Sequence, residues 1–187
     1  MDEQKNPWTT LSSKTVLNNN WIKVSDHKVL NPNGNKGVYG TVHFKNLAIG
    51  IIPIDKELNT YLVGQYRFPL KQYSWEIPEG GGDLNITPVE SAKRELLEET
   101  GIKAENYEEI VQMHLSNSVS DEKAHVFIAR GLSFHESSPE DSEELIIKKV
   151  KLTDAFKMVA NEEITDSLSV AGLLKVELML SKRDLKI

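Results

Sequence analysis

Three glutamates within one helical turn are the residues of this sequence best placed to do chemistry. Glu95, Glu98 and Glu99 stand at positions i, i+3 and i+4, so on a helix their carboxylates project from one face. Like charges at this spacing destabilise a helix by about 0.2–0.5 kcal/mol per pair. Magnesium would relieve that repulsion, because it prefers oxygen ligands and binds to carboxylates and substrate phosphates together. An acidic face turned to solvent is the simpler explanation if these three residues are taken alone.

The segment that carries these glutamates has the features of a helix from residue 87 to residue 101. Thr87 suits the N-cap, Pro88 the first helical position, and Glu90 the returning half of a capping box. Gly101 supplies the C-terminal stop.

The surrounding residues resemble the Nudix box, G-x5-E-x7-R-E-U-x-E-E-x-G-U, in which U is a bulky aliphatic residue. Eight of its nine defined positions match: Gly80, Arg94, Glu95, Leu96, Glu98, Glu99, Gly101 and Ile102. The departure is Ile86, which stands where the family has its first glutamate. This resemblance favours a metal site over a solvated acidic face.

The resemblance implies ligands for Mg²⁺, with Mn²⁺ able to substitute. They would be Glu95 and Glu99, often with Glu98, and the backbone carbonyl of Glu79. The family's first glutamate normally braces the box arginine, so Ile86 puts the support of Arg94 in doubt. Glu90 lies one turn before Arg94, and we expect it to replace the missing brace.

A second stretch is similar to the branch of the family that hydrolyses ADP-ribose and other nucleoside diphosphate sugars. It runs Gln65-Tyr66-Arg67-Phe68-Pro69 and then Trp75-Glu76-Ile77-Pro78-Glu79-Gly80-Gly81-Gly82. By this resemblance Arg67 contacts a phosphate, and Glu76 contacts substrate or holds Arg67. A surface Arg–Glu pair is the alternative.

The resemblance also suggests a catalytic base and two further substrate contacts. The acidic segment 139–144 is similar to a loop that carries the base in relatives, which makes Glu140 the first candidate, Glu143 the second and Glu98 the third. Glu122 either approaches substrate or is an exposed loop acid. Trp21 either stacks on a nucleotide base in a dimer, as a flat aromatic ring can, or is a core residue. His114 and His125 are expected to be structural.

Hydrophobic periodicity predicts a β-rich first half and a mixed second half. Short apolar or alternating runs indicate strands at 21–30, 38–44, 47–54, 61–66, 110–115, 124–129 and 145–150. Two more helices are expected, over 154–160 after a Thr153 cap and over 166–180 with Val170, Leu174 and Leu178 on one stripe. We therefore expect an α/β sandwich with a mixed sheet, and the resemblance implies that it is a Nudix-type α/β/α sandwich. The resemblance also implies that residues 1–45 are an antiparallel β extension that dimerises and that residues 46–187 are the hydrolase domain.

Composition limits the classes of protein and partner. The 187 residues include no cysteine, which excludes disulfides and thiolate metal sites and is compatible with a cytoplasmic protein. The net charge of −6 argues against a partner of long nucleic acid, and no apolar stretch approaches the roughly 20 residues that a membrane helix needs.

The expected function is metal-dependent hydrolysis of a nucleoside diphosphate sugar to a nucleoside monophosphate and a sugar phosphate. Two alternatives stay open. One is a pyrophosphohydrolase acting on dinucleoside polyphosphates or the 5′ end of RNA. The other is a sugar-nucleotide sensor without catalytic activity.

Overall fold

The computed structural model describes residues 5–138 and 144–185, and the chain divides into two compact units. The first unit comprises Met1–Asn46 and His114–Glu122, and the second comprises Leu47–Met113 and Lys123–Ile187. The first unit therefore contains, besides the N-terminal extension that we expected, a second segment that includes Glu122.

An antiparallel sheet of three strands forms most of the first unit. Its strands are β1 (Thr9–Asn18), β2 (Ile22–Leu30) and β3 (Lys36–Phe44). Periodicity did not indicate β1, because the strand is rich in Ser and Thr and all ten of its residues are exposed. The 114–122 segment is joined to this sheet through Val42, whose N–H donates to the Val119 carbonyl at 2.8 Å.

The described residues of the second unit form two sheets and three helices. A mixed four-stranded sheet has the order β7-β4-β9-β8, with β4 (Leu47–Pro53) parallel to β9 (Lys123–Phe134) and antiparallel to β7 (Glu79–Gly82); β8 is Ile102–His114. A three-stranded sheet has the order β10-β5-β6, formed by Ile146–Lys151, Asn59–Arg67 and Gln72–Glu76. The helices are α1 (Pro88–Thr100), α2 (Leu152–Ala160) and α3 (Ser167–Ser181). No helix in the described part of the chain combines the length and apolar character needed to cross a membrane.

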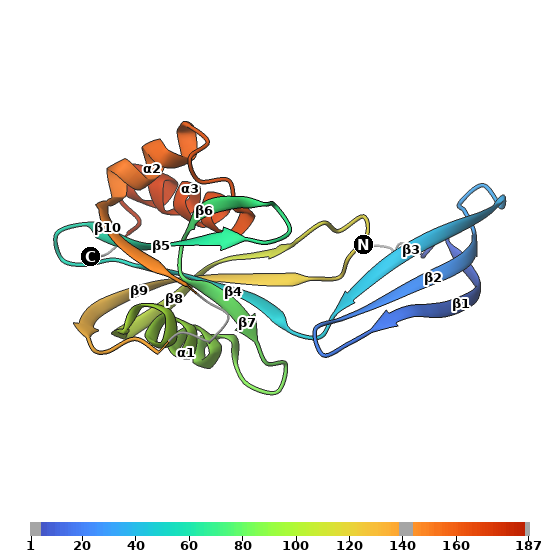
Figure 1. Cartoon of the computed structure of the whole chain (residues 1–187). Coiled ribbons are helices and arrows are strands. Elements are labelled where there is room, and N and C mark those ends of the chain that lie inside the picture. Colours follow the sequence, from blue (N-terminus) through green and yellow to red (C-terminus); the bar gives the residue numbers. More distant parts are fainter. Residues whose placement is uncertain (1–4, 139–143, 186–187) are drawn as a thin grey trace. The chain divides into compact units, whose positions relative to one another are not determined.

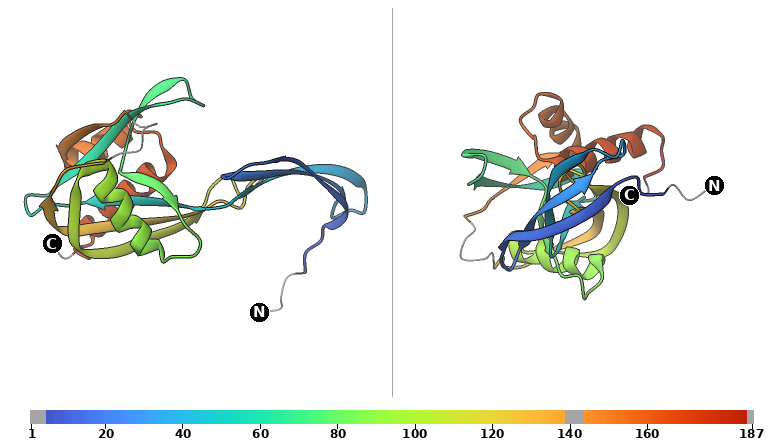
Figure 2. Two further views of the ribbon diagram at one scale, coloured as in Figure 1. Left: turned by 60° about the horizontal axis from the view of Figure 1, so that its bottom comes forward. Right: turned by 90° about the vertical axis from the view of Figure 1, so that its right-hand side faces the viewer.

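The helices of the second unit cover opposite faces of the mixed sheet (Figures 1 and 2). Ile49 and Ile51 of β4 lie in one core cluster with Leu96 of α1. The intervening Gly50 faces the other way, where a Cβ would press against Leu168 of α3. Because successive strand residues point to opposite faces, α1 and α3 lie on different sides of β4. The predicted α/β/α sandwich with a mixed sheet is confirmed.

Local capping explains where α1 begins and ends. The Thr87 side chain accepts a hydrogen bond from the Glu90 N–H, Pro88 opens the helix, and Gly101 ends it at a φ of 69°. The left-handed φ suits glycine, which has no Cβ to clash there. The predicted ends of this helix are confirmed.

Two details of the C-terminal helices were predicted wrongly. Helix α2 begins at Leu152 after an N-cap at Lys151 that has no side-chain cap bond, so Thr153 is not the cap. On α3 the buried stripe includes Leu168, Leu173 and Val176, whereas Leu174 and Leu178 are about half exposed. Gly172 is buried in close contact with Ile52 and Val126, so the face of α3 that packs on the sheet is the one that contains this glycine and not the predicted leucine stripe.

Candidate active site

The three box glutamates lie on one face of α1 and differ in exposure. Glu95 and Glu99 are 8% and 2% exposed, while a third of the Glu98 side chain is exposed. Gly80 of β7 packs so closely against Glu95 that a Cβ at residue 80 would overlap the carboxyl group. The glycine of the box is therefore needed for the close approach of β7 to α1.

Residue 79 connects this helix face to the sheet. Its backbone N–H donates to Glu99 Oε2 at 3.0 Å, and pairing of β7 with β4 places it opposite Gly50. A strand peptide thus orients one of the buried carboxylates of α1.

Arg67 of β5 binds two glutamates from neighbouring strands. Its Nε and Nη2 donate to Glu76 at 2.9 Å and 2.5 Å, and Nη2 also donates to Glu79 Oε1 at 2.7 Å. Glu76 is only 2% exposed and also accepts from the Gln65 amide at 3.3 Å, so this is a buried cluster and not a surface pair. Burial alone would lower the pKa of Arg67, but Glu76 and Glu79 hold it above its usual value.

A further carboxylate, Asp166, reaches the same cluster and was not predicted. Burial raises the pKa of Glu79 well above its ordinary value, and the carboxylates of Asp166 and Glu76 raise it further, against the lowering effect of Arg67. Asp166 is the N-cap of α3, where its carboxylate accepts from the Ser169 N–H at 2.8 Å. The capping pattern was visible in the sequence, but the neighbour across the fold was not.

Arg94 contacts the helix face itself. Its Nη1 donates to Glu98 Oε2 at 2.7 Å, and its Nη2 donates to Glu95 Oε1 at 2.5 Å and to the Gly81 carbonyl at 2.8 Å. Glu90 instead pairs with Lys93 at 2.5 Å. The prediction that Glu90 braces Arg94 is therefore wrong, because the Lys93 ammonium occupies the Glu90 carboxylate while Arg94 turns toward β7.

The donor set suits a hard divalent cation, because it consists of carboxylate and backbone oxygens without sulfur or nitrogen. Within residues 5–138 and 144–185, however, no three acidic or histidine side chains already surround a common point. Arg94 lies against two of the carboxylates expected to bind the ion.

Comparison with known proteins fits this arrangement. Residues 45–169 match a family model described as "NUDIX domain". The chain belongs to the Nudix family. Residues 8–42 match a second model, "Nucleoside diphosphate sugar hydrolase N-terminal domain".

Individual Nudix relatives align along most of their length. The chain is 29% identical to the methanol dehydrogenase activator of Bacillus methanolicus and 30% identical to the ADP-ribose pyrophosphatase of Bacillus subtilis. Each alignment covers 90% of this chain and 92% of the relative. A crystal structure of an ADP compounds hydrolase superposes with a TM-score of 0.86 at 21% identity, over 97% of this chain and 98% of the other, which shows the shared fold.

The other predicted site residues lie elsewhere or outside the described residues. Glu140 and Glu143 belong to 139–143, which the structure does not describe. Trp21, between β1 and β2, is 62% exposed and so is not a core residue. Glu122 is partly buried, and burial raises its pKa. His125 is buried and contacts Glu109 at 2.7 Å, which fits the structural role expected of it.

Proposed function

We propose that this Nudix protein hydrolyses the pyrophosphate bond of a nucleoside diphosphate sugar, with ADP-ribose as the first substrate to test. The products would be a nucleoside monophosphate and a sugar phosphate. The match of residues 8–42 to the N-terminal domain of nucleoside diphosphate sugar hydrolases supports this class, as does the similarity to an ADP-ribose pyrophosphatase.

One observation carries the proposal: residue 79 joins two clusters that such a reaction needs. Its N–H holds Glu99 on the helix face, and its side chain holds Arg67. Strand β7 therefore places a guanidinium, which suits phosphate oxygens, close in the structure to carboxylates that suit a divalent ion.

The roles of the residues follow from their chemistry. Glu95, Glu98 and Glu99, with the Glu79 carbonyl, would hold Mg²⁺ or Mn²⁺, which would neutralise phosphate charge and activate water. Arg67 and Glu76 would bind substrate directly or fix the strands that do. Trp21, acting on the nucleotide pocket of a neighbouring subunit, and Glu122 are proposed as further substrate contacts.

The general base is proposed to be Glu140 or Glu143, with Glu98 third. Oε2 of Glu98 already accepts a hydrogen bond from Arg94, so a water would have to use its other oxygen. A base contributes about 100- to 10,000-fold to rate. Glu140→Gln and Glu143→Gln should lower kcat with little change in KM, and wild-type turnover in both would transfer the role to Glu98.

A substrate panel with Mg²⁺ tests the function. ADP-ribose, other nucleoside diphosphate sugars, dinucleoside polyphosphates and 5′-triphosphorylated RNA should be compared by identifying the products. We expect sugar nucleotides to give the highest kcat/KM. Exclusive cleavage of polyphosphates or RNA would favour the other hydrolase class, and tight sugar-nucleotide binding without turnover would favour a sensor.

A cytoplasmic homodimer is part of the same proposal, with residues 1–45 as the dimerising extension and 46–187 as the hydrolase domain. Sedimentation of the full chain and of a chain lacking residues 1–45 tests the dimer. A monomeric full chain would refute it. Cell fractionation tests the location.

A further inference from the structure

Arg94 uses the same carboxylates that are proposed to bind the metal ion. Its two terminal nitrogens contact Glu95 Oε1 at 2.5 Å and Glu98 Oε2 at 2.7 Å. Bonds between a guanidinium and a carboxylate are among the stronger hydrogen bonds in proteins. A cation that approaches either oxygen must displace Arg94 or bind beside its positive charge.

The surroundings offer Arg94 few other acceptors. Ile86, 43% exposed before the helix, has no polar side-chain atom, and the Glu90 carboxylate is engaged by Lys93. Asp83 accepts hydrogen bonds from the backbone and side chain of Asn85 at 2.8 Å and 2.7 Å. These bonds lower the pKa of Asp83, and attraction to Arg94 lowers it by a smaller amount. Among residues 5–138 and 144–185, Arg94 also donates to the Gly81 carbonyl at 2.8 Å, besides Glu95 and Glu98.

We propose that Arg94 is a positioning residue that competes with the divalent ion for Glu95 and Glu98, because residue 86 supplies no carboxylate to draw it away. Metal loading and release of Arg94 from these oxygens are then one coupled step. This inference rests on the proposed function, since it requires the ion to bind at the box glutamates.

The electrostatic effect is large enough to measure. A unit positive charge roughly 6 Å from a divalent ion, in surroundings like water, weakens binding by about tenfold. Removal of the Arg94 charge should therefore tighten metal binding, whereas a residue that only supports the ligands would weaken binding when removed.

The first experiment compares Arg94→Gln with Lys93→Gln in the full chain. Lys93 is the matched control, because it has the same charge, is adjacent in sequence, and pairs with Glu90. Mn²⁺ affinity is measured without substrate from the EPR signal of the free ion. We expect Arg94→Gln to bind Mn²⁺ about five- to tenfold more tightly and Lys93→Gln to change less than about twofold, since Lys93 pairs with Glu90 and not with a proposed metal ligand. Unchanged or weaker binding in Arg94→Gln overturns the proposal.

The second experiment returns the missing carboxylate through Ile86→Glu, in the wild type and in Arg94→Gln. If the new glutamate draws Arg94 away, it tightens Mn²⁺ binding only where Arg94 is present. An equal effect in both backgrounds would mean that the added charge acts directly on the ion, and would overturn the role of residue 86. Thermal unfolding shows whether each variant is folded.

Glu99→Gln separates failure of this inference from failure of the proposed metal site. Weaker Mn²⁺ binding in Glu99→Gln, with no tightening in Arg94→Gln, refutes the competition and leaves the metal site standing. Unchanged Mn²⁺ binding in Glu99→Gln places the ion elsewhere and refutes both.

Discussion

Two arginines contact glutamates at or next to the acidic helix face, and their partners differ in origin and, for one partner of each arginine, in burial. Arg67 binds Glu76 and Glu79 from two other strands, and these glutamate side chains are 2% and 13% exposed. Arg94 binds Glu95 and Glu98 from its own helix, with side chains 10% and 33% exposed. Loss of Arg67 would leave buried charge and disconnect three strands, whereas loss of Arg94 would break contacts with two residues of its own helix and with the Gly81 carbonyl of β7. The same residue type therefore joins strands in one cluster and would tune the proposed metal site in the other.

The largest effect on activity is expected from Glu99→Gln, at the point where the Arg67 cluster meets the helix. Outer-shell partners of metals typically contribute 10- to 100-fold, so loss of a proposed direct ligand should lower kcat/KM by more than about 100-fold. The substitution keeps the size of the side chain, so the melting temperature should change little. Steady-state kinetics and thermal unfolding of one preparation give both values. Full activity in the presence of a chelator would show that hydrolysis does not require a metal ion.

The comparison between the arginines is tested most directly by their stability. Breaking a buried ion pair costs about 3–5 kcal/mol, so Arg67→Met should lower the free energy of unfolding by about 3 kcal/mol. Arg94→Met should cost less than Arg67→Met, because the Arg94 side chain is 40% exposed and one of its two glutamate partners, Glu98, is 33% exposed. Urea unfolding of the two variants measures the difference. Equal losses would show that the burial of the partners does not distinguish the clusters.

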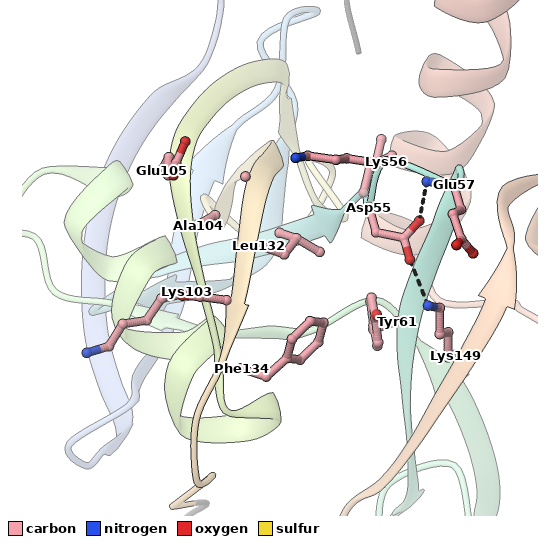
Figure 3. A pocket seen from close by; sticks show the side chains of 13 residues that line it. Asp55, Lys56, Glu57, Tyr61, Lys103, Ala104, Glu105, Leu132, Phe134 and Lys149 are labelled. Atoms are coloured by element: carbon pink, nitrogen blue, oxygen red, sulfur yellow. Dashed lines mark hydrogen bonds and ion pairs between the residues drawn. The ribbon is translucent and has the colours of Figure 1, made fainter.

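Substitution of Asp55 tests whether a carboxylate held by hydrogen bonds can stabilise the fold as a buried carboxylate such as Glu76 does. It lines a cavity of the second unit, where it contacts the Glu57 backbone and Lys149 (Figure 3). Burial would raise the pKa of Asp55, but Lys149 and the backbone N–H and side-chain amide of Asn59 hold it well below the ordinary 3.8. We expect Asp55→Ala to cost about 2 kcal/mol of stability without loss of turnover, because it removes several hydrogen bonds to a charged group.

The pH dependence of this cost follows from the lowered pKa. A carboxylate whose pKa is lower in the folded state stabilises fully above its unfolded pKa and loses that effect as pH falls through the folded pKa. The cost of Asp55→Ala should therefore be constant above about pH 5 and shrink below about pH 4. Urea unfolding at several pH values measures it, and a cost independent of pH would assign the effect to packing.

The sequence predicted elements whose signals are local. Helix α1 could be placed because Thr87, Pro88 and Gly101 act within their own turns, and the box spacing put three glutamates on one face. Strand β1 gave no signal because both its faces are exposed. Contacts set by the fold could not be predicted, such as Asp166 beside Glu79 or the close packing of Gly172 on the sheet. The partners of Arg94 were mistaken because helical spacing allows both Glu90 and Glu98, whereas in the fold Glu90 pairs with Lys93 and Arg94 contacts Glu98 and the Gly81 carbonyl.

The smallest effect is expected from Glu90→Ala, which tests the boundary of the Arg94 cluster. Glu90 is more than half exposed and pairs with Lys93 at i,i+3, an interaction worth about 0.2–0.5 kcal/mol. The backbone N–H of Glu90, which the Thr87 cap uses, is retained in the variant, so the start of the helix should persist. Stability should fall by less than about 0.5 kcal/mol, and kcat/KM and Mn²⁺ affinity should match the wild type. A marked loss of turnover would mean that Glu90 reaches Arg94 during catalysis. The exposed Glu90–Lys93 pair could then no longer be treated as separate from the Arg94 cluster.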